Sequence, residues 1–329
     1  MNQRVCQGRN RAERNLSRSE QKSYLKAVQC LRRKQPQTDK SDMPGVTNRF
    51  EDFLGDHILQ TGPNHFTGYF YPWHRLLIAM YEREIRKCGF KGAQPYWDWS
   101  IDAVSAETMV SSPVFDTEYG FGSNGPWVPG TQESPDSDVF VTAENFPFDL
   151  SSRTGGGCLT DGPFANMTIH MGPGYNMSYN PWCVRRDFVP AEFLRNANKE
   201  VVDDNMAKEN FNLFQQSSEF TLHVAGHHGI GGLYGTLTDI YASPGDPLFF
   251  LHHANLDRVW WSWQSKNLTE RLSDISGPLE PNDWANEKSR NVTLDDEVHF
   301  GTTVKTTVAI RDVMDVEGDF LCYTYADLY

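Results

Sequence analysis

Histidines crowd one short stretch of the chain. Residues 220–235 read FTLHVAGHHGIGGLYG and contain three of the ten histidines, His223, His227 and His228. His223 and His227 are four residues apart, so on a helix both imidazoles leave the same face. Two imidazoles at this spacing can bind one metal ion. The stretch therefore predicts part of a metal site.

Five further histidines lie in or beside stretches that are expected to be helical, and only His170 and His299 fall elsewhere. A single buried histidine is most often a hydrogen-bonded core residue. Eight histidines gathered in this way instead indicate two metal sites, each with three imidazoles and an open position. The two sets are His57, His65 and His74, and His223, His227 and one of His252 and His253.

The ligand type limits which metals could bind but does not decide between them. Neither set contains a cysteine or a carboxylate at ligand spacing. All-imidazole sites suit zinc, copper, iron or nickel. Zinc with three imidazoles and a water would make a hydrolase or a hydratase. Two copper(I) ions would together supply the two electrons that reduce O₂ to the peroxide level.

Five stretches with helical periodicity are expected to position these histidines. Between the second and third lies TGPNHFTGYFYP, which is too rich in glycine, proline and aromatic residues for a long helix. The last helix is expected to begin with Asp246 as its N-cap and Pro247 in its first turn. The predicted helices cover residues 21–33 with Ser19 as N-cap, 48–59, 73–88 between Pro72 and Gly89, about 211–227, and 246–266.

The rest of the chain predicts loops and a few strands. Residues 101–190 hold many Gly, Pro, Ser and Asp residues, which indicates long loops laid over a helical core. The tail after Asn291 alternates apolar and polar residues, as in VKTTVAIRDVMD, and predicts short strands. We expect one mainly α domain that spans residues 1–329.

Composition limits the partners and the compartment. A net charge of −13 argues against nucleic acid, and no apolar run reaches the ~20 residues that cross a membrane. Six cysteines without a CxxC pair and five N-x-S/T sequons favour a secreted glycoprotein with disulfide bonds. The polar first residues show no signal peptide, as in a mature form. We expect a monomer or a weak dimer.

The histidine-bearing stretches resemble the copper-A and copper-B motifs of the tyrosinase and catechol oxidase family, whose members are type 3 copper proteins. The similarity is greatest to the short fungal members. It covers roughly residues 48–266, and CYTY at residues 322–325 resembles the Y-x-Y motif that ends the family's core domain. It implies a four-helix bundle that holds two copper ions. The motifs are HFTGYFYPWHRLLIAMYER with PYWDWS, HVAGHHGIGG, and SPGDPLFFLHHANLDRVWWSWQ.

The resemblance also implies which histidines bind which ion. His253 is preferred to His252 because His252 shares its helix face with an apolar stripe. His253 shares its face with Phe249, whose family counterpart stacks on the copper-B imidazoles, and with Asp257, which could orient a ligand imidazole through its free N–H. The implied ligands are His57, His65 and His74 for copper A, and His223, His227 and His253 for copper B.

Four residues are implied on the substrate side. Glu219 matches a glutamate that holds a water able to act as base for the incoming phenol. Val224 stands where several tyrosinases carry an asparagine that helps this glutamate. His228 is expected to face the substrate entrance, and Ile240 matches a residue that hangs over copper A.

Two family features are missing. Many fungal and plant relatives link a cysteine to the second copper-A histidine through a thioether, but Pro63 stands two residues before His65. His65 is therefore expected on a loop held only by packing. The family's C-terminal lid domain is also expected to be absent, as in an active, processed form.

The predicted function is the oxidation of o-diphenols by O₂ to o-quinones and water. Three alternative functions with the same or related copper chemistry stay open. They are a tyrosinase that also hydroxylates monophenols, an o-aminophenol oxidase, and an O₂ carrier like haemocyanin. A dizinc hydrolase is the alternative with another metal.

Overall fold

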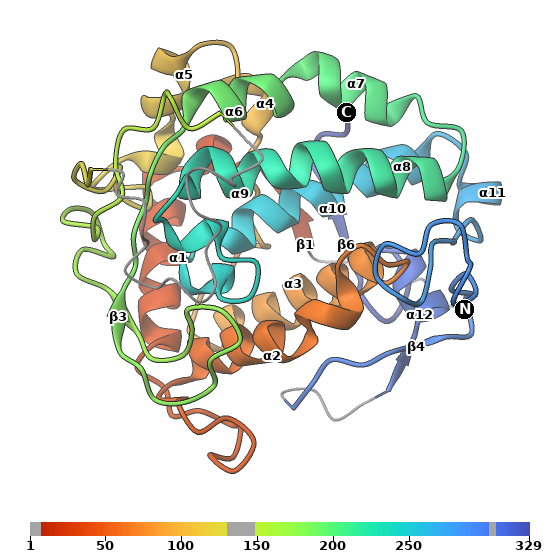
Figure 1. Cartoon of the computed structure of the whole chain (residues 1–329), viewed down its shortest axis with the longest axis horizontal. Coiled ribbons are helices and arrows are strands. Elements are labelled where there is room, and N and C mark those ends of the chain that lie inside the picture. The colour runs from red at the N-terminus through yellow and green to blue at the C-terminus, as the bar shows by residue number, and fades with distance from the viewer. Residues whose placement is uncertain (1–7, 130–148, 303–306) are drawn as a thin grey trace.

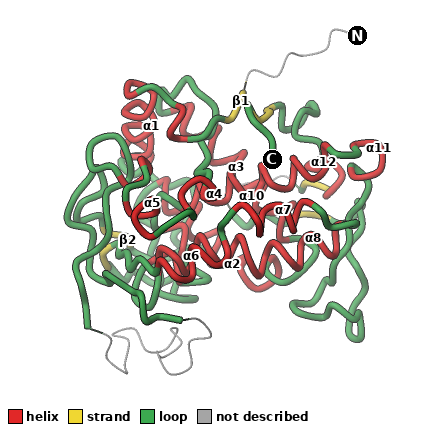
Figure 2. The backbone as a smooth tube through the Cα atoms, turned by 90° about the horizontal axis from the view of Figure 1, so that it is seen from above, coloured by secondary structure: helices red, strands yellow, loops and turns green. Residues whose placement is uncertain are grey.

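The computed structural model describes residues 8–129, 149–302 and 307–329 (Figure 1). Helices make up most of its regular structure, which confirms the prediction of a mainly α fold. The strands form three two-stranded sheets away from the helical centre (Figure 2). They are β1 (Gly8–Asn10) parallel to β6 (Tyr323–Tyr325), β2 (Thr168–Ile169) antiparallel to β3 (Trp182–Cys183), and β4 (Glu297–Val298) antiparallel to β5 (Val308–Ala309).

A four-helix bundle forms the centre of the molecule. In Figure 1 α2 and α3 lie on one side, α8 and α9 on the other, and α10 between them. Every residue of α10 except Ser265 is buried, so this helix is the core of the bundle. The bundle helices are α2 (Arg49–Asn64), α3 (Phe70–Lys87), α8 (Phe211–Ser218) with its continuation α9 (Val224–Gly231), and α10 (Phe249–Ser265).

Local chemistry fixes the ends of the outer helix α1 (Arg18–Leu31) and of α3. Helix α1 starts at Ser17, two residues before the expected cap, because Ser17 and Glu20 form a capping box. Helix α3 ends before Gly89, which adopts φ 95° as a helix-ending glycine often does. The disulfide Cys30–Cys88 joins the ends of these two helices.

Several predicted helix boundaries are wrong. Helix α3 starts at Phe70 rather than after Pro72, and α9 runs to Gly231 rather than ending near His227. Helix α2 runs past Leu59 to Asn64, with Pro63 inside its last turn, where the missing N–H costs one hydrogen bond close to the end of the helix. Helix α10 starts at Phe249 rather than Asp246. The Asp246 carboxylate instead pairs with Arg186, with 2.7 Å between Oδ2 and Nε, and it accepts a hydrogen bond from the Leu248 N–H.

The C-terminal prediction of strands is only partly right. Residues 310–314 form α12 (Ile310–Met314) where strands were expected, and residues 303–306 lie outside the described part. The prediction of long loops holds for most described residues between 111 and 189, although two short helices precede them and two follow. The remaining helices are α4 (Trp99–Asp102), α5 (Ala106–Val110), α6 (Pro190–Asn196), α7 (Lys199–Met206) and α11 (Leu268–Arg271).

None of the helices in the described ranges is long and apolar enough to cross a bilayer.

Candidate metal centre

Two clusters of three buried histidines lie inside the bundle. Within each cluster the candidate ligand atoms lie within 4.8 Å of one another. Helix α2, the loop after it and helix α3 supply the first cluster, and the second comes from α9, α10 and the π-helical segment η3 (Glu219–His223). The structure therefore brings together the same two sets that the sequence predicted. The clusters are His57, His65 and His74, and His223, His227 and His253.

Backbone carbonyls hold the protonated nitrogen in five of these six imidazoles. Each Nδ1 lies within hydrogen-bonding distance of a carbonyl oxygen, which can only accept, so Nδ1 carries the proton and Nε2 keeps its lone pair. Such contacts orient metal-binding imidazoles in other proteins. The pairs are His57 with Tyr241 (2.7 Å), His65 with Thr61 (3.0 Å), His74 with Phe70 (2.7 Å), His223 with Glu219 (3.3 Å) and His227 with Leu237 (2.6 Å).

The inward nitrogens lack protein partners that would satisfy them. The Nε2 atoms of His57, His74 and His223 are buried without a hydrogen-bond partner among the described residues. The Nε2 atoms of His227 and His253 face each other at 3.1 Å. Buried polar atoms in this state are unfavourable unless something binds them. A metal ion in each cluster would satisfy these lone pairs, so the residues present fit a dinuclear metal centre.

Burial keeps the imidazoles neutral. Loss of hydration lowers the pKa of His65 to about 4. For His57 and His253 the same burial, reinforced by neighbouring imidazoles, holds the pKa well below the ordinary 6.5. A neutral imidazole is the form that binds a metal ion, so both clusters are ready to bind at neutral pH.

The contacts of His252 explain why it belongs to neither cluster. Its Nδ1 accepts a hydrogen bond from the Trp99 indole at 3.1 Å, and its Nε2 donates to the His223 carbonyl at 3.1 Å. Both nitrogens are therefore occupied. Gly226 packs so closely on this ring that a Cβ atom there would lie 2.1 Å from it. His252 is a structural residue that supports the helix carrying His223.

Phe249 contacts a histidine of each cluster. Its ring stacks on His253 with centroids 4.0 Å apart and meets His57 edge-on at 5.2 Å. These contacts match the position that the sequence predicted for Phe249. They limit the directions in which either imidazole can turn.

Asp257 does not make the contact that was expected of it. One carboxylate oxygen accepts from Arg75 at 2.5 Å, and the other accepts from the hydroxyls of Tyr323 and Tyr325, each at 2.5 Å. The Nδ1 of His253 has no hydrogen-bond partner in the described part of the chain. Asp257 therefore anchors the C-terminal Y-x-Y segment to the bundle and does not orient a ligand imidazole.

Hydrogen bonds, and not packing alone, hold the loop that carries His65. The Phe66 N–H donates to the Glu219 carboxylate at 2.7 Å, and Gln215 donates from its amide to the Thr67 carbonyl. The Phe66 carbonyl accepts from the Asn282 N–H at 3.0 Å. The expectation of a loop without such support, drawn from the missing cysteine, is therefore wrong.

Glu219 is the first residue of a π-helical turn that joins α8 to α9. Such single turns are often found at functional sites. Its carboxyl is completely buried, which raises its pKa to about 8 despite the hydrogen bonds from Phe66 and Gln215. Helical periodicity places Glu219 and His223 on one face but cannot predict the wider turn, because a π-turn leaves no distinct residue pattern.

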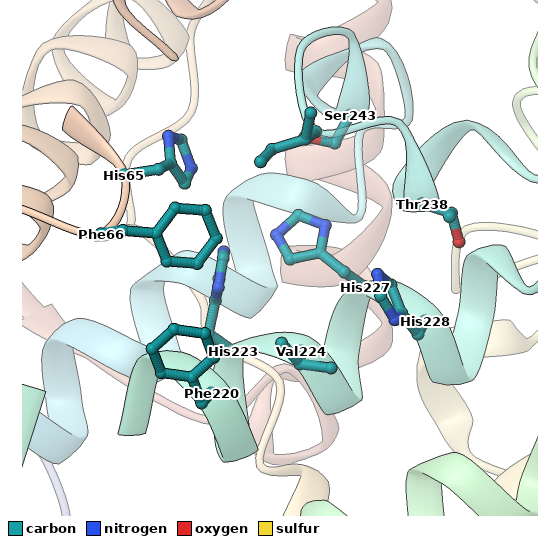
Figure 3. A pocket seen from close by; sticks show the side chains of 10 residues that line it. His65, Phe66, Phe220, His223, Val224, His227, His228, Thr238 and Ser243 are labelled. Atoms are coloured by element: carbon teal, nitrogen blue, oxygen red, sulfur yellow. The ribbon is translucent and has the colours of Figure 1, made fainter. Parts of the chain in front are cut away.

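A cavity of about 260 Å³ opens beside the two clusters (Figure 3). Three of the four residues that the sequence placed on the substrate side line it, Val224, His228 and Ile240, whereas the fully buried Glu219 does not. Burial lowers the pKa of His228 to about 4. Sequence reasoning missed the other non-histidine lining residues, because they come from separate segments that only the fold brings together. These are Phe66, Phe220, Thr238 and Ser243.

The fold and the two clusters define a class of protein with a dinuclear metal centre inside a helical bundle. A sequence model of the common central domain of tyrosinase matches residues 47–266. A tyrosinase-like protein, phomQ1', from Diaporthe leptostromiformis is 31% identical over 95% of this chain and 78% of its own length. Tyrosinase P from Aspergillus terreus is 31% identical over 94% of this chain and 89% of its own length. The chain belongs to the tyrosinase family of type 3 copper proteins.

Solved structures agree with this assignment. A polyphenol oxidase from Thermothelomyces thermophila, studied as a point mutant, superposes with a TM-score of 0.82 at 33% identity, over 97% of this chain and 89% of its own. An octopus haemocyanin unit has a TM-score of 0.53 at 17% identity, over 97% of this chain and 68% of its own. The second likeness shows a shared fold alone.

Proposed function

We propose that this protein is a copper-dependent catechol oxidase, which converts two o-diphenols and one O₂ into two o-quinones and two waters. The observation that carries the proposal is the pair of neutral imidazole clusters, with free Nε2 atoms, beside a mostly apolar cavity. His57, His65 and His74 would hold one copper ion, and the other three histidines the second. Two copper ions bound there would exchange two electrons with O₂, which side chains alone cannot do.

The chain's own residues supply orientation and an apolar surround. The carbonyls of Tyr241 and Leu237 orient the rings of His57 and His227, and Phe249 stacks on the ring of His253. The cavity of about 260 Å³ is large enough for one aromatic ring, and its lining is mostly apolar. A catechol would enter this cavity with its two hydroxyl groups toward the metal centre.

Glu219 is proposed as the base that receives the phenolic proton, through a water. Without metal, burial raises its pKa to about 8, so the carboxyl is mostly protonated at neutral pH. Positive charge near a carboxyl lowers its pKa. Copper binding would therefore favour the ionised form that acts as a base.

Val224 favours a catechol oxidase over a tyrosinase. Its side chain lines the cavity and can neither donate nor accept a hydrogen bond, so it cannot help Glu219 hold a water. A monophenol has a pKa near 10 and needs more help to lose its proton than a catechol does. Tyrosinase activity and o-aminophenol oxidation are the second candidates, and relatives named as tyrosinases support the former.

An O₂ carrier is disfavoured because ligands can reach the cavity. Ile240 and Phe220, which line it, are 40% and 49% exposed. A carrier needs a covered site, and among the described residues nothing closes this one. A dizinc hydrolase would share the imidazole clusters but would not consume O₂.

The proposed function is tested by O₂ uptake. Copper-loaded protein is compared on catechol, tyrosine and o-aminophenol under the same conditions. The proposal predicts rapid uptake with catechol, with slow uptake or a lag on tyrosine. Uptake that is fastest on tyrosine or o-aminophenol would replace the assignment, and no uptake on any of the three would refute an oxidase.

We also propose that the protein is a secreted glycoprotein. Two disulfides, Cys30–Cys88 and Cys158–Cys183, are formed, and Cys322 is also disulfide-bonded. These bonds suit an oxidising compartment. Four of the five sequon asparagines are exposed, so glycans could be attached there. The exposed ones are Asn15, Asn166, Asn267 and Asn291. Enzymatic removal of N-linked glycans from protein made in a secretory host should lower its mass, and an unchanged mass would contradict glycosylation.

A further inference from the structure

Two phenylalanines that the proposed chemistry does not use stand at the mouth of the cavity. The rings of Phe66 and Phe220, here called the aromatic pair, stack with centroids 5.3 Å apart and planes 24° apart. Phe220 is 49% exposed, so one side of the pair is open to a ligand. Figure 3 shows both rings beside His223, on the opposite side of the cavity from Thr238.

The backbone around the aromatic pair directs it toward the cavity. Phe66 has φ 58°, a conformation that large side chains adopt only where the surroundings impose it. The Glu219 carboxylate holds the Phe66 N–H at 2.7 Å, and Phe220 is the next residue after Glu219. One buried carboxyl therefore connects the two members of the pair.

The remaining wall of the cavity offers no positive side chain. Apart from histidines and the aromatic pair, it consists of Val224, Ile240, Thr238 and Ser243, and none of the described lining residues is Lys or Arg. The whole chain carries a net charge of −13. A substituent carboxylate at the mouth of such a cavity loses hydration without a Lys or Arg side chain to pair with, and the protein's net charge repels it on approach.

We propose that the aromatic pair selects phenolic substrates with uncharged, apolar substituents over substrates that carry a carboxylate. This inference names a substrate class for the proposed oxidase and rests on that function. An apolar substituent that packs on Phe220 leaves water for an aromatic surface, which is favourable. A carboxylate in the same place gains nothing comparable.

The test compares one catechol acid with its own ester. The substrates are 3-(3,4-dihydroxyphenyl)propionic acid and its methyl ester, which differ only in the charged group. The kcat/KM of copper-loaded protein is measured for both by O₂ uptake at neutral pH. We expect the ester to exceed the acid by about tenfold or more, the ratio that a difference of ~1.4 kcal/mol produces. Equal values would overturn the proposal.

Two arginine variants separate a local effect from a change in total charge. Phe220→Arg places a guanidinium at the mouth and should lower the ester-to-acid ratio by about tenfold. Leu213→Arg adds the same charge on α8, at a residue that is 46% exposed and outside the cavity, and should keep the native ratio. The same shift in both variants, or in neither, would contradict the proposal.

Failure of the oxidase function can be recognised separately. If unsubstituted catechol is not oxidised, the function fails, and the aromatic pair is then judged by binding. Calorimetry without O₂ gives the dissociation constants of the ester and the acid. An ester that binds about tenfold more tightly supports the selection, and equal constants refute it.

Discussion

At the residue scale, backbone carbonyls decide which nitrogen of each imidazole faces the metal centre. The sequence predicts the six histidines because helical spacing and motif order carry their positions. It could not predict that His252 uses both nitrogens in hydrogen bonds to Trp99 and the His223 carbonyl. Nor could it predict the partners of Asp257, because Arg75 and the two tyrosines come from distant parts of the chain.

The residue-scale prediction concerns Val224. Val224→Asn introduces a side chain that can hydrogen-bond a water beside Glu219. We expect the ratio of initial rates on 4-methylcatechol and p-cresol to fall by roughly three- to tenfold, since one hydrogen bond is worth about 0.5–1.5 kcal/mol. The ratio is measured in native and variant protein with equal copper content.

Two results would count against this account. Similar native rates on the two substrates would indicate a tyrosinase. An unchanged ratio in Val224→Asn would leave the catechol oxidase activity standing, but it would show that Val224 does not cause the preference for catechols.

At the element scale, the segments that join the bundle helices shape the site. The loop at residues 65–68 and the π-helical segment η3 supply His65, the aromatic pair and Glu219. Periodicity predicted that the bundle helices exist, because apolar residues recur at helical spacing along them. It missed the π-turn and the start of α10, since Asp246 is held by Arg186 from a separate loop.

The element-scale prediction concerns Gln215 on α8, which supports the loop after α2. Its amide holds the Thr67 carbonyl, and Gln215→Ala removes this support from the loop that carries His65. We expect copper affinity to fall by roughly two- to tenfold, because the Thr67 carbonyl keeps the Phe70 N–H but loses one hydrogen bond, which is worth about 0.5–1.5 kcal/mol. The affinity is measured by competition with a copper chelator.

Gln216→Ala is the matched control for this prediction. Gln216 is the next residue on α8 and donates instead to Asn212 at 3.1 Å. It should keep the native copper affinity. Equal affinities for the two variants would show that Gln215 does not position the His65 loop.

At the scale of the whole molecule, buried histidines couple stability to pH. Burial lowers the pKa of His65 and His228 to about 4 and that of His252 to about 3. Above about pH 6.5 these groups are neutral in both states, so their contribution to stability is complete. As pH falls, the unfolded chain takes up protons that the folded chain cannot. The raised pKa values of Glu219 and Glu13 act in the opposite direction, but the buried histidines with lowered pKa values outnumber these two carboxyls.

The free energy of unfolding of the metal-free protein should therefore fall between about pH 6.5 and pH 4. Each such histidine contributes up to about 1.4 kcal/mol per pH unit. Urea unfolding at about pH 7.5 and about pH 5 measures the difference. Equal stability at the two values would show that these imidazoles are not buried in the neutral form.

Copper content per chain tests the central claim most directly. Elemental analysis follows copper loading and removal of free metal from native protein, His253→Ala and His252→Gln. We predict two copper ions per native chain and in His252→Gln, because both nitrogens of His252 are used in hydrogen bonds, and one or none in His253→Ala. A native chain that binds no copper, or a loss of copper in His252→Gln but not in His253→Ala, would contradict the account.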